Sequence, residues 1–241
     1  MENELIARLI PGDAVTPSVP QILVICAIAL VIVSVRPLWR VARLGVTLVH
    51  ELGHAMVGIL VGRKFTGFVL RGDASGHAIT VGRSRGPGLV ATLWAGYPAP
   101  ALVGAGLIAA AAAGWAAPII AVMMVVLLIA MIRIRSGLTA LVTIGVFAGL
   151  AALWWFRNDG LQILVLATTA AVLIVGAWRH VVVAARDRSG DNDARVLARI
   201  TGVPRVLWLA TFVLVCTAAA LVFGWAVVPT ETIRTLLPAG A

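Results

Sequence analysis

Seven long apolar segments are the strongest constraint on how this chain of 241 residues can fold. A helix needs about 20 apolar residues to cross the hydrocarbon core of a bilayer. Because lipid offers no hydrogen-bond partners to the backbone, helices are the only form open to such segments. The segments cover residues 20–35, 43–62, 88–112, 116–132, 137–156, 161–178 and 205–228. The sequence therefore predicts an all-α polytopic membrane protein with six to seven transmembrane helices, of which the first is short.

Composition agrees with an integral membrane protein. Hydrophobic residues make up 61% of the chain and charged residues 12%, whereas a soluble domain is about half apolar and a quarter charged. The net charge of +9 comes mainly from basic residues that lie between the apolar segments, which is typical of topology signals and contact with lipid headgroups. We therefore expect a multi-pass protein of the plasma membrane, with the bilayer as partner and no nucleic acid. Residues 1–241 are interpreted as a single integral membrane domain.

The connections differ in charge, and this predicts their side of the membrane. Residues 63–87, 133–135 and 179–205 are rich in arginine, whereas residues 113–117 carry no charge. By the positive-inside rule, the connections after the second, fourth and sixth segments lie inside. Arg36 and Arg40 fall on the opposite side in this scheme.

Two connections are expected to be structured. In residues 65–82, two short β-prone runs flank the turn-forming stretch "RGDASG", which predicts a small β-hairpin between the second and third spans. In residues 189–201, Asn192 or Asp193 offers an N-cap ahead of an apolar stripe. That pattern predicts a short amphipathic helix at the membrane surface.

The second apolar segment carries the pattern His50-Glu51-Leu52-Gly53-His54. An acidic residue at bilayer depth costs about 2.5–3.5 kcal/mol, so its presence needs a reason. Histidines at positions i and i+4 share one helix face and can bind one zinc ion, with the glutamate placed to act on a water that the metal activates. A simple hydrogen-bonded pair of histidines would leave the buried glutamate unexplained. The pattern predicts Zn²⁺ as cofactor, His50 and His54 as metal ligands and Glu51 as general base.

A catalytic zinc ion needs a third protein ligand and one open position. His54 lies nine residues before Arg63, and so about 13 Å below the inner surface at about 1.5 Å per helical residue. The connection 179–205 lies on that side, which favours Asp193 or Asp191, whereas Asp159 lies on the opposite side. Asp193 could instead be a helix N-cap. The other histidines, more simply explained as solvated or interfacial side chains, are His77 and His180.

The motif in its membrane context resembles the site-2 protease-like intramembrane zinc metalloproteases, and the later motifs are most similar to the compact bacterial branch of that superfamily. The resemblance covers roughly residues 41–228 and continues in order through "ASGHAITVG", "AGYPAPALVGAGL", "RNDG" and "DNDARVLARITGVPRVLW". It implies a helical membrane domain with the metal-binding helix at 43–62, the hairpin at 65–82, a four-helix region at 88–180, the interfacial helix at 189–201 and the last span at 205–228.

The resemblance also implies roles for single residues. It makes His50 and His54 metal ligands and Glu51 the base, and Asp193 matches the acid of the branch's Ser-Asp-Ala, with asparagine in place of serine. Better-known members take their third ligand from an Asp-Gly motif on a later span, which keeps Asp159 as a competitor. The implied function is an intramembrane zinc metalloendopeptidase that hydrolyses peptide bonds of a transmembrane protein substrate. The alternative is a non-proteolytic metal-binding scaffold or regulator of the same fold.

Overall fold

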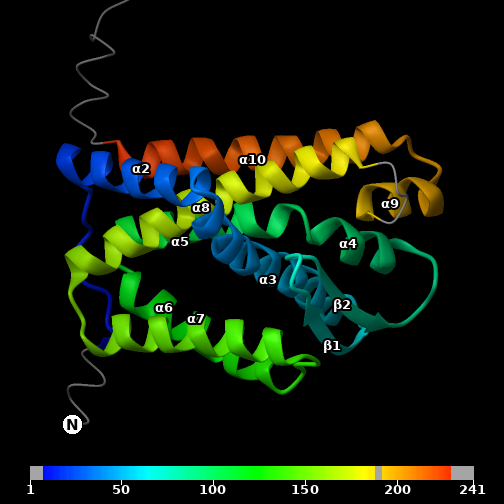
Figure 1. Ribbon diagram of the computed structural model, residues 1–241, viewed down its shortest axis with the longest axis horizontal. Coiled ribbons are helices and arrows are strands. Elements are labelled where there is room, and N and C mark those ends of the chain that lie inside the picture. The colour runs from blue at the N-terminus through cyan, green and yellow to red at the C-terminus, as the bar shows by residue number, and fades with distance from the viewer. Residues whose placement is uncertain (1–7, 188–191, 229–241) are drawn as a thin grey trace, which may run out of the picture.

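The structure is a computed structural model that describes residues 8–187 and 192–228, and most of these residues are helical (Figure 1). The helices are α2 (Val19–Ser34), α3 (Arg36–Leu60), α4 (Pro87–Ala95), α5 (Pro98–Ala112), α6 (Ala116–Met131), α7 (Gly137–Trp155), α8 (Asp159–Arg186), α9 (Asp193–Thr201) and α10 (Arg205–Val227). The strands are β1 (Lys64–Leu70) and β2 (Gly76–Val81). The predicted helical membrane fold with one small hairpin is thus confirmed in outline.

The number of spans is smaller than the sequence predicted. Three described helices, α7, α8 and α10, are long and apolar enough to cross a membrane, and α6 is shorter. Two further candidates are bent pairs: α2 with α3 at 97°, and α4 with α5 at 63°. Prolines stand at the start of α3 and of α5, where a missing backbone N–H prevents a continuous helix. The described part of the chain therefore holds three to five candidate spans, and seven separate spans are not confirmed.

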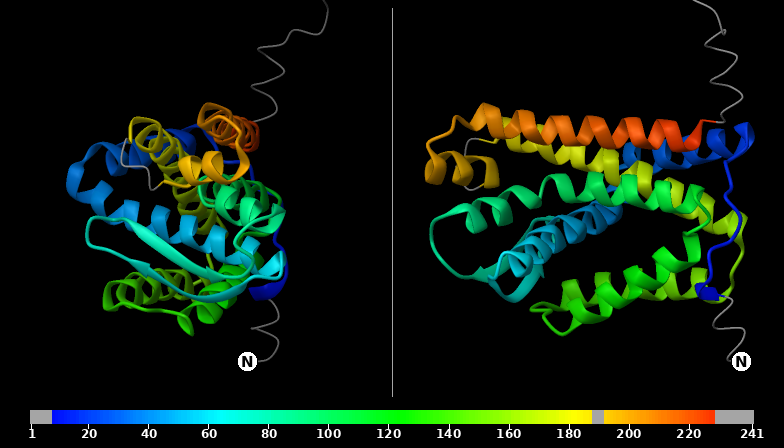
Figure 2. Two further views of the ribbon diagram at one scale, coloured as in Figure 1. Left: turned by 90° about the vertical axis from the view of Figure 1, so that its right-hand side faces the viewer. Right: turned by 180° about the vertical axis from the view of Figure 1, so that it is seen from behind.

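Helix α8 forms the centre of the bundle. In its most apolar stretch 56% of the residues are buried, compared with 17% in α7 and in α10. Helices α2, α5 and α10 pack around it, while α6 and α7 form a separate pair on the far side of α3 (Figures 1 and 2). Gly176 of α8 allows α3 to approach closely, since a Cβ there would lie 2.6 Å from a methyl group of Val46. This crossing fixes α3, which carries the predicted motif, against the central helix.

The hairpin is tied to two neighbouring parts of the fold, the α6–α7 connection and α3. Strands β1 and β2 are antiparallel, with a bulge between Phe65 and Gly67. The outer edge of β1 pairs with the α6–α7 connection, where Phe68 N–H donates to the carbonyl of Arg133 at 3.2 Å. On the other side, the hydroxyl of Thr47 in α3 donates to the carbonyl of Ala74 in the turn at 2.9 Å. These bonds hold the start of β2 over the middle of α3.

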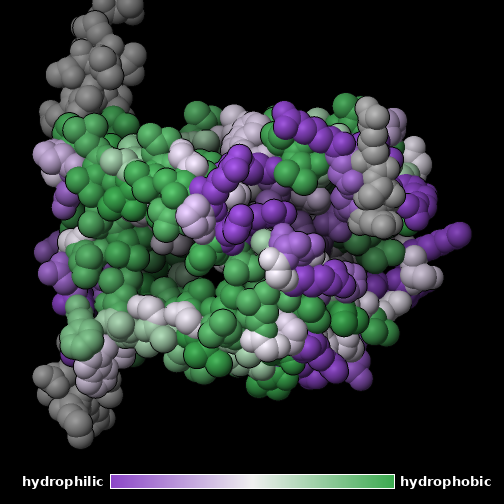
Figure 3. Space-filling view, viewed as in Figure 1, coloured by the Kyte–Doolittle hydropathy of each residue, from purple (hydrophilic) through white to green (hydrophobic). Residues whose placement is uncertain are grey.

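The three basic connections gather at one end of the molecule. The hairpin, the α6–α7 connection and α9 all lie there in Figure 1, and hydrophilic surface is concentrated toward the same end in Figure 3. This common end agrees with the predicted alternation, and which side of the membrane it faces stays a prediction. The α2–α3 bend does not lie at the far end: Arg179, in the C-terminal part of α8, donates to Val33 O at 2.6 Å and lies 4.2 Å from the centre of the Trp39 ring. Arg36, which follows the bend, is therefore displaced from the side that the sequence suggested.

Helix α9 lies within the predicted range 189–201, whose first three residues are outside the described part of the chain. Asn192 is its N-cap, and its side-chain oxygen accepts from the N–H of Arg195 at 3.2 Å. Gly202 ends the helix with φ of +73°, a left-handed conformation that glycine adopts without strain. The buried face of α9, with Ala194 and Leu197, packs in the same core cluster as residues of α8 and α10. Its position at a membrane surface remains a prediction.

Candidate metal centre

Helix α3 places both histidines of the motif on one face. The Nε2 atoms of His50 and His54 lie 3.1 Å apart, as the i, i+4 spacing predicts. Glu51 is 4% exposed and His54 8% exposed, so the motif is nearly withdrawn from solvent. Burying an acid and an imidazole costs free energy unless they are hydrogen-bonded or paired with an opposite charge. The groups that surround the motif therefore have to supply such partners.

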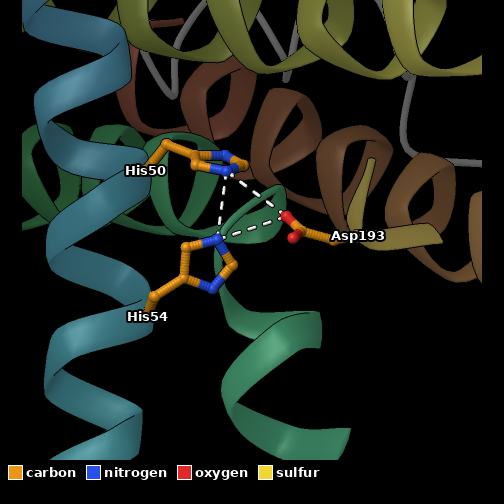
Figure 4. Close-up of side chains that lie close together, drawn as sticks. All are labelled: His50, His54 and Asp193. Carbon is orange, nitrogen blue, oxygen red and sulfur yellow. Dashed lines mark hydrogen bonds and ion pairs between the residues drawn. The ribbon is translucent and has the colours of Figure 1, made fainter. Parts of the chain in front are cut away.

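Helix α9 brings Asp193 to the two histidines across about 140 residues of sequence. Its Oδ2 lies 3.4 Å from His50 Nε2 and 3.2 Å from His54 Nε2 (Figure 4). Because Asn192 is the N-cap, the carboxylate of Asp193 is not used for capping and points into the site. Arg195 attaches α9 to the end of α8 by donating to the carbonyl of Asp187 at 2.9 Å. The docking of α9 thus determines whether this third group is in place.

The other acids and histidines predicted as candidates lie elsewhere. Asp159 begins α8 at the opposite end of the bundle and pairs with Arg157 at 2.9 Å. Asp191 is outside the described residues. His77 lies on β2 at the edge of the site cavity, and His180 lies on α8 with its ring centre 5.9 Å from that of His50. Of the candidate acids that the structure describes, Asp193 is the one that meets the histidine pair.

The hydrogen bond of His54 defines the chemistry of the cluster. Its Nδ1 donates to the carbonyl of Thr92 at 2.7 Å, which turns Nε2 toward Asp193. Burial would raise the pKa of the Asp193 carboxyl, but the neighbouring His54 and His50 hold it well below its usual range. An ionised carboxylate therefore faces the histidine nitrogens, an arrangement that a bound cation stabilises.

Two observations indicate that a metal ion fits among these atoms. The three donor atoms form a triangle with sides of 3.1, 3.2 and 3.4 Å. A tetrahedral zinc site with bonds of about 2.0 Å separates its ligand atoms by about 3.3 Å, so three corners of a tetrahedron are already in place. Gly96 supplies the second observation: a Cβ there would collide with His54 Nε2 and lie 2.7 Å from His50 Nε2. The space beside the donors is kept open by the absence of a side chain.

A cavity of about 230 Å³ opens beside the cluster, which is room for several water molecules. It is lined by the motif residues and by parts of β2, α4 and the start of α9. Glu51 borders the same cavity, and its carboxylate lies against Gly76, where a Cβ would be 2.5 Å from Oε1. The acid is therefore packed tightly at the edge of a space that also borders the three donor atoms.

Three contributors to the site were not predicted from the sequence. Gly96 and Gly76 make room for the donor atoms and for Glu51, and the carbonyl of Thr92 orients His54. Gly96 precedes the only tyrosine of the chain, within "AGYPAP". A close approach between two helices leaves no pattern in one sequence, so only the three-dimensional contact identifies these residues.

Comparison with known families decides the relationship. The family model described as Peptidase M50B-like matches residues 23–224, which is most of the chain. The chain belongs to the Peptidase M50B-like family. This is consistent with the resemblance to site-2 proteases, and the matched residues of this M50B-like chain include the motif on α3 and Asp193 on α9. No curated protein and no solved structure gives a significant match.

Proposed function

We propose that this M50B-like protein is an intramembrane zinc metalloendopeptidase that cleaves a transmembrane protein substrate. The observation that carries the proposal is the triangle of His50, His54 and Asp193 beside the buried Glu51, within a family of peptidases. His50, His54 and Asp193 would hold the zinc ion, which leaves a fourth position toward the cavity. Glu51 would be the catalytic base.

The residues divide the work of hydrolysis among them. Zinc, when bound, supplies a Lewis acid that polarises water and the peptide carbonyl. Glu51 takes a proton from the attacking water and delivers a proton to the leaving amine as the C–N bond breaks. The contact with Gly76 limits the positions open to its carboxylate and holds it at the cavity wall. His54 is kept in the tautomer with a free Nε2 by its bond to the Thr92 carbonyl.

The proposal extends to the environment of the protein. We place the whole of residues 1–241 in one integral domain of the plasma membrane, with α9 at the membrane surface. A peptide bond inside a helix is shielded by its own hydrogen bonds, so the substrate must unwind before it reaches Glu51. The cavity supports this arrangement because its walls are partly polar, with Thr80, Thr92 and Asn192 among them, and admit the water that hydrolysis consumes.

The experiment measures zinc content and cleavage together. Purified protein in detergent should contain zinc and should cleave at least one member of a library of transmembrane peptides. Glu51→Gln is close in size to the native residue and cannot act as a base, so it should keep the metal and lose cleavage. Wild-type protein without zinc would refute the metalloprotease. Zinc in the protein without cleavage of any peptide would favour the non-proteolytic metal-binding scaffold instead.

A further inference from the structure

One nitrogen of the candidate metal centre lacks a hydrogen-bond partner in the described part of the chain. Nδ1 of His50 is buried, and no hydrogen-bond partner for it exists among the described residues. The equivalent atom of His54 donates to the Thr92 carbonyl. A histidine that binds a metal almost always donates its second N–H to a carboxylate, a carbonyl or a water, which fixes both tautomer and orientation. His50 therefore needs an acceptor that the helix α3 does not provide.

His180 of α8 is a ring neighbour of His50 that could provide such an acceptor. Its ring centre is 5.9 Å from that of His50, and the two ring planes are inclined at 78°. The position follows from the helix crossing: Val46 of α3 touches Gly176 of α8, and each histidine comes four residues, about one turn, after its contact residue.

Other neighbours of His50 are less suitable. Tyr97 packs edge-to-face against His50, with ring centres 4.9 Å apart. This contact restrains the orientation of the His50 ring by packing. Arg43 lies two helical turns before His50 on α3. A guanidinium carries only donors, so Arg43 cannot accept a hydrogen bond from His50 Nδ1. A neutral imidazole offers one donor and one acceptor nitrogen. His180 can therefore supply the missing acceptor.

We propose that His180 is a positioning residue for His50. Its unprotonated ring nitrogen accepts the Nδ1–H of His50, directly after a small side-chain rotation or through one water molecule. This bond keeps the lone pair of His50 Nε2 directed at the metal position, as the Thr92 carbonyl does for His54. The inference rests on the proposed function because it concerns a metal ligand. In this role His180 acts through His50 and not on the metal or the substrate directly.

The test is the zinc dissociation constant of the full chain, measured by competition with a chelator. His180→Phe keeps a ring and removes the acceptor, and should weaken zinc binding about 10- to 100-fold, the usual effect of losing such a partner. His180→Asn and His180→Gln place an amide oxygen near the Nδ1 and Nε2 positions respectively. One of the two should restore affinity close to wild type and so identify the nitrogen involved. Val182→Phe on the same helix is the control and should leave zinc affinity unchanged, since Val182 is 41% exposed and does not line the site cavity.

The outcomes separate this inference from the proposed function. Wild-type affinity in His180→Phe would overturn the inference, provided that wild-type protein binds zinc and His54→Ala does not. Equal weakening in the Phe, Asn and Gln variants would also overturn it, because loss of packing alone would then explain the effect. Absence of zinc from wild type would instead refute the metalloprotease. A thermal unfolding transition shows whether each variant is folded. If His180→Phe does not fold, comparison of the Asn and Gln variants with wild type still tests the inference.

Discussion

Gly96 shapes the site as strongly as the ionisable side chains do. A Cβ at this position would lie 2.7 Å from His50 Nε2 and still closer to His54 Nε2, so any side chain would crowd the donor atoms. The backbone around it is a break between α4 and α5, which lets the end of α4 approach α3 without a side chain between them. The site therefore depends on a residue without functional groups.

Gly96→Ala should abolish stoichiometric zinc binding, because the added methyl group takes the space beside His50 and His54. Gly106→Ala on α5 is the control, since a Cβ there meets nothing within 4 Å and metal content should stay at the wild-type level. Both are measured by elemental analysis of purified protein. Full zinc content in Gly96→Ala would show that the donors can separate to admit a methyl group, contrary to the tight packing.

At the scale of elements, a buried polar contact with α7 helps to hold the hairpin in place. The N–H of Leu70 donates to the hydroxyl of Thr139 on α7 at 2.8 Å, and this joins β1 to a helix far from it in sequence. Thr143, one turn further along α7, is also fully buried, but its hydroxyl has no partner in the described part of the chain. Two chemically identical groups on one helix thus differ in their bonding.

Thr139→Val should destabilise the protein by about 1–3 kcal/mol, because it leaves the buried N–H of Leu70 without an acceptor. Thr143→Val should be neutral or stabilising, since it removes an unsatisfied hydroxyl at nearly constant volume. The thermal midpoint in detergent compares the two variants directly. Equal losses of stability would mean that volume and not hydrogen bonding governs this interface.

Removal of the N-cap of α9 should weaken metal binding modestly. Asn192→Ala loses the N-cap, worth about 1 kcal/mol, and should weaken zinc binding about fivefold because the helix that carries Asp193 is less well formed. Asn192→Ser keeps a capping oxygen and should remain near wild type. Chelator competition measures both. An unchanged affinity in Asn192→Ala would mean that the contacts of Arg195 hold α9 without its cap.

For the whole molecule, features set within one element could be predicted from the sequence, whereas most contacts between elements could not. Apolar length predicted the helices, and the i, i+4 spacing of His50 and His54 predicted the shared face, because both rules act within one element. The bend between α2 and α3 and the shortness of α6 reduced the count of candidate spans, because neither the angle at a helix break nor the exact end of a helix is set by apolar length. Asp193 was favoured from topology and family resemblance, whereas the approach of Gly96 and His180 follows from helix crossings that no local rule describes.

The arrangement of connections predicts a labelling pattern. In a variant with Cys26 and Cys216 replaced by alanine, single cysteines at positions 73 and 84 should react with a membrane-impermeant reagent from one side. Cysteines at positions 115 and 156 should react from the other, because those residues are exposed at the opposite end of the bundle. The basic connections predict that positions 73 and 84 face the cytoplasm. Labelling of all four positions from one side would contradict the arrangement.

The central claim is that Asp193 completes a zinc site with the two histidines of α3. It is tested most directly by the zinc content of the wild type and of His54→Ala, Asp193→Ala and Asp159→Ala, purified in the same way. We expect one zinc per chain in the wild type and in Asp159→Ala, and loss of zinc in the other two, because only Asp193 lies within 3.4 Å of both imidazoles among the described acids. Zinc retained in Asp193→Ala and lost in Asp159→Ala would contradict the claim.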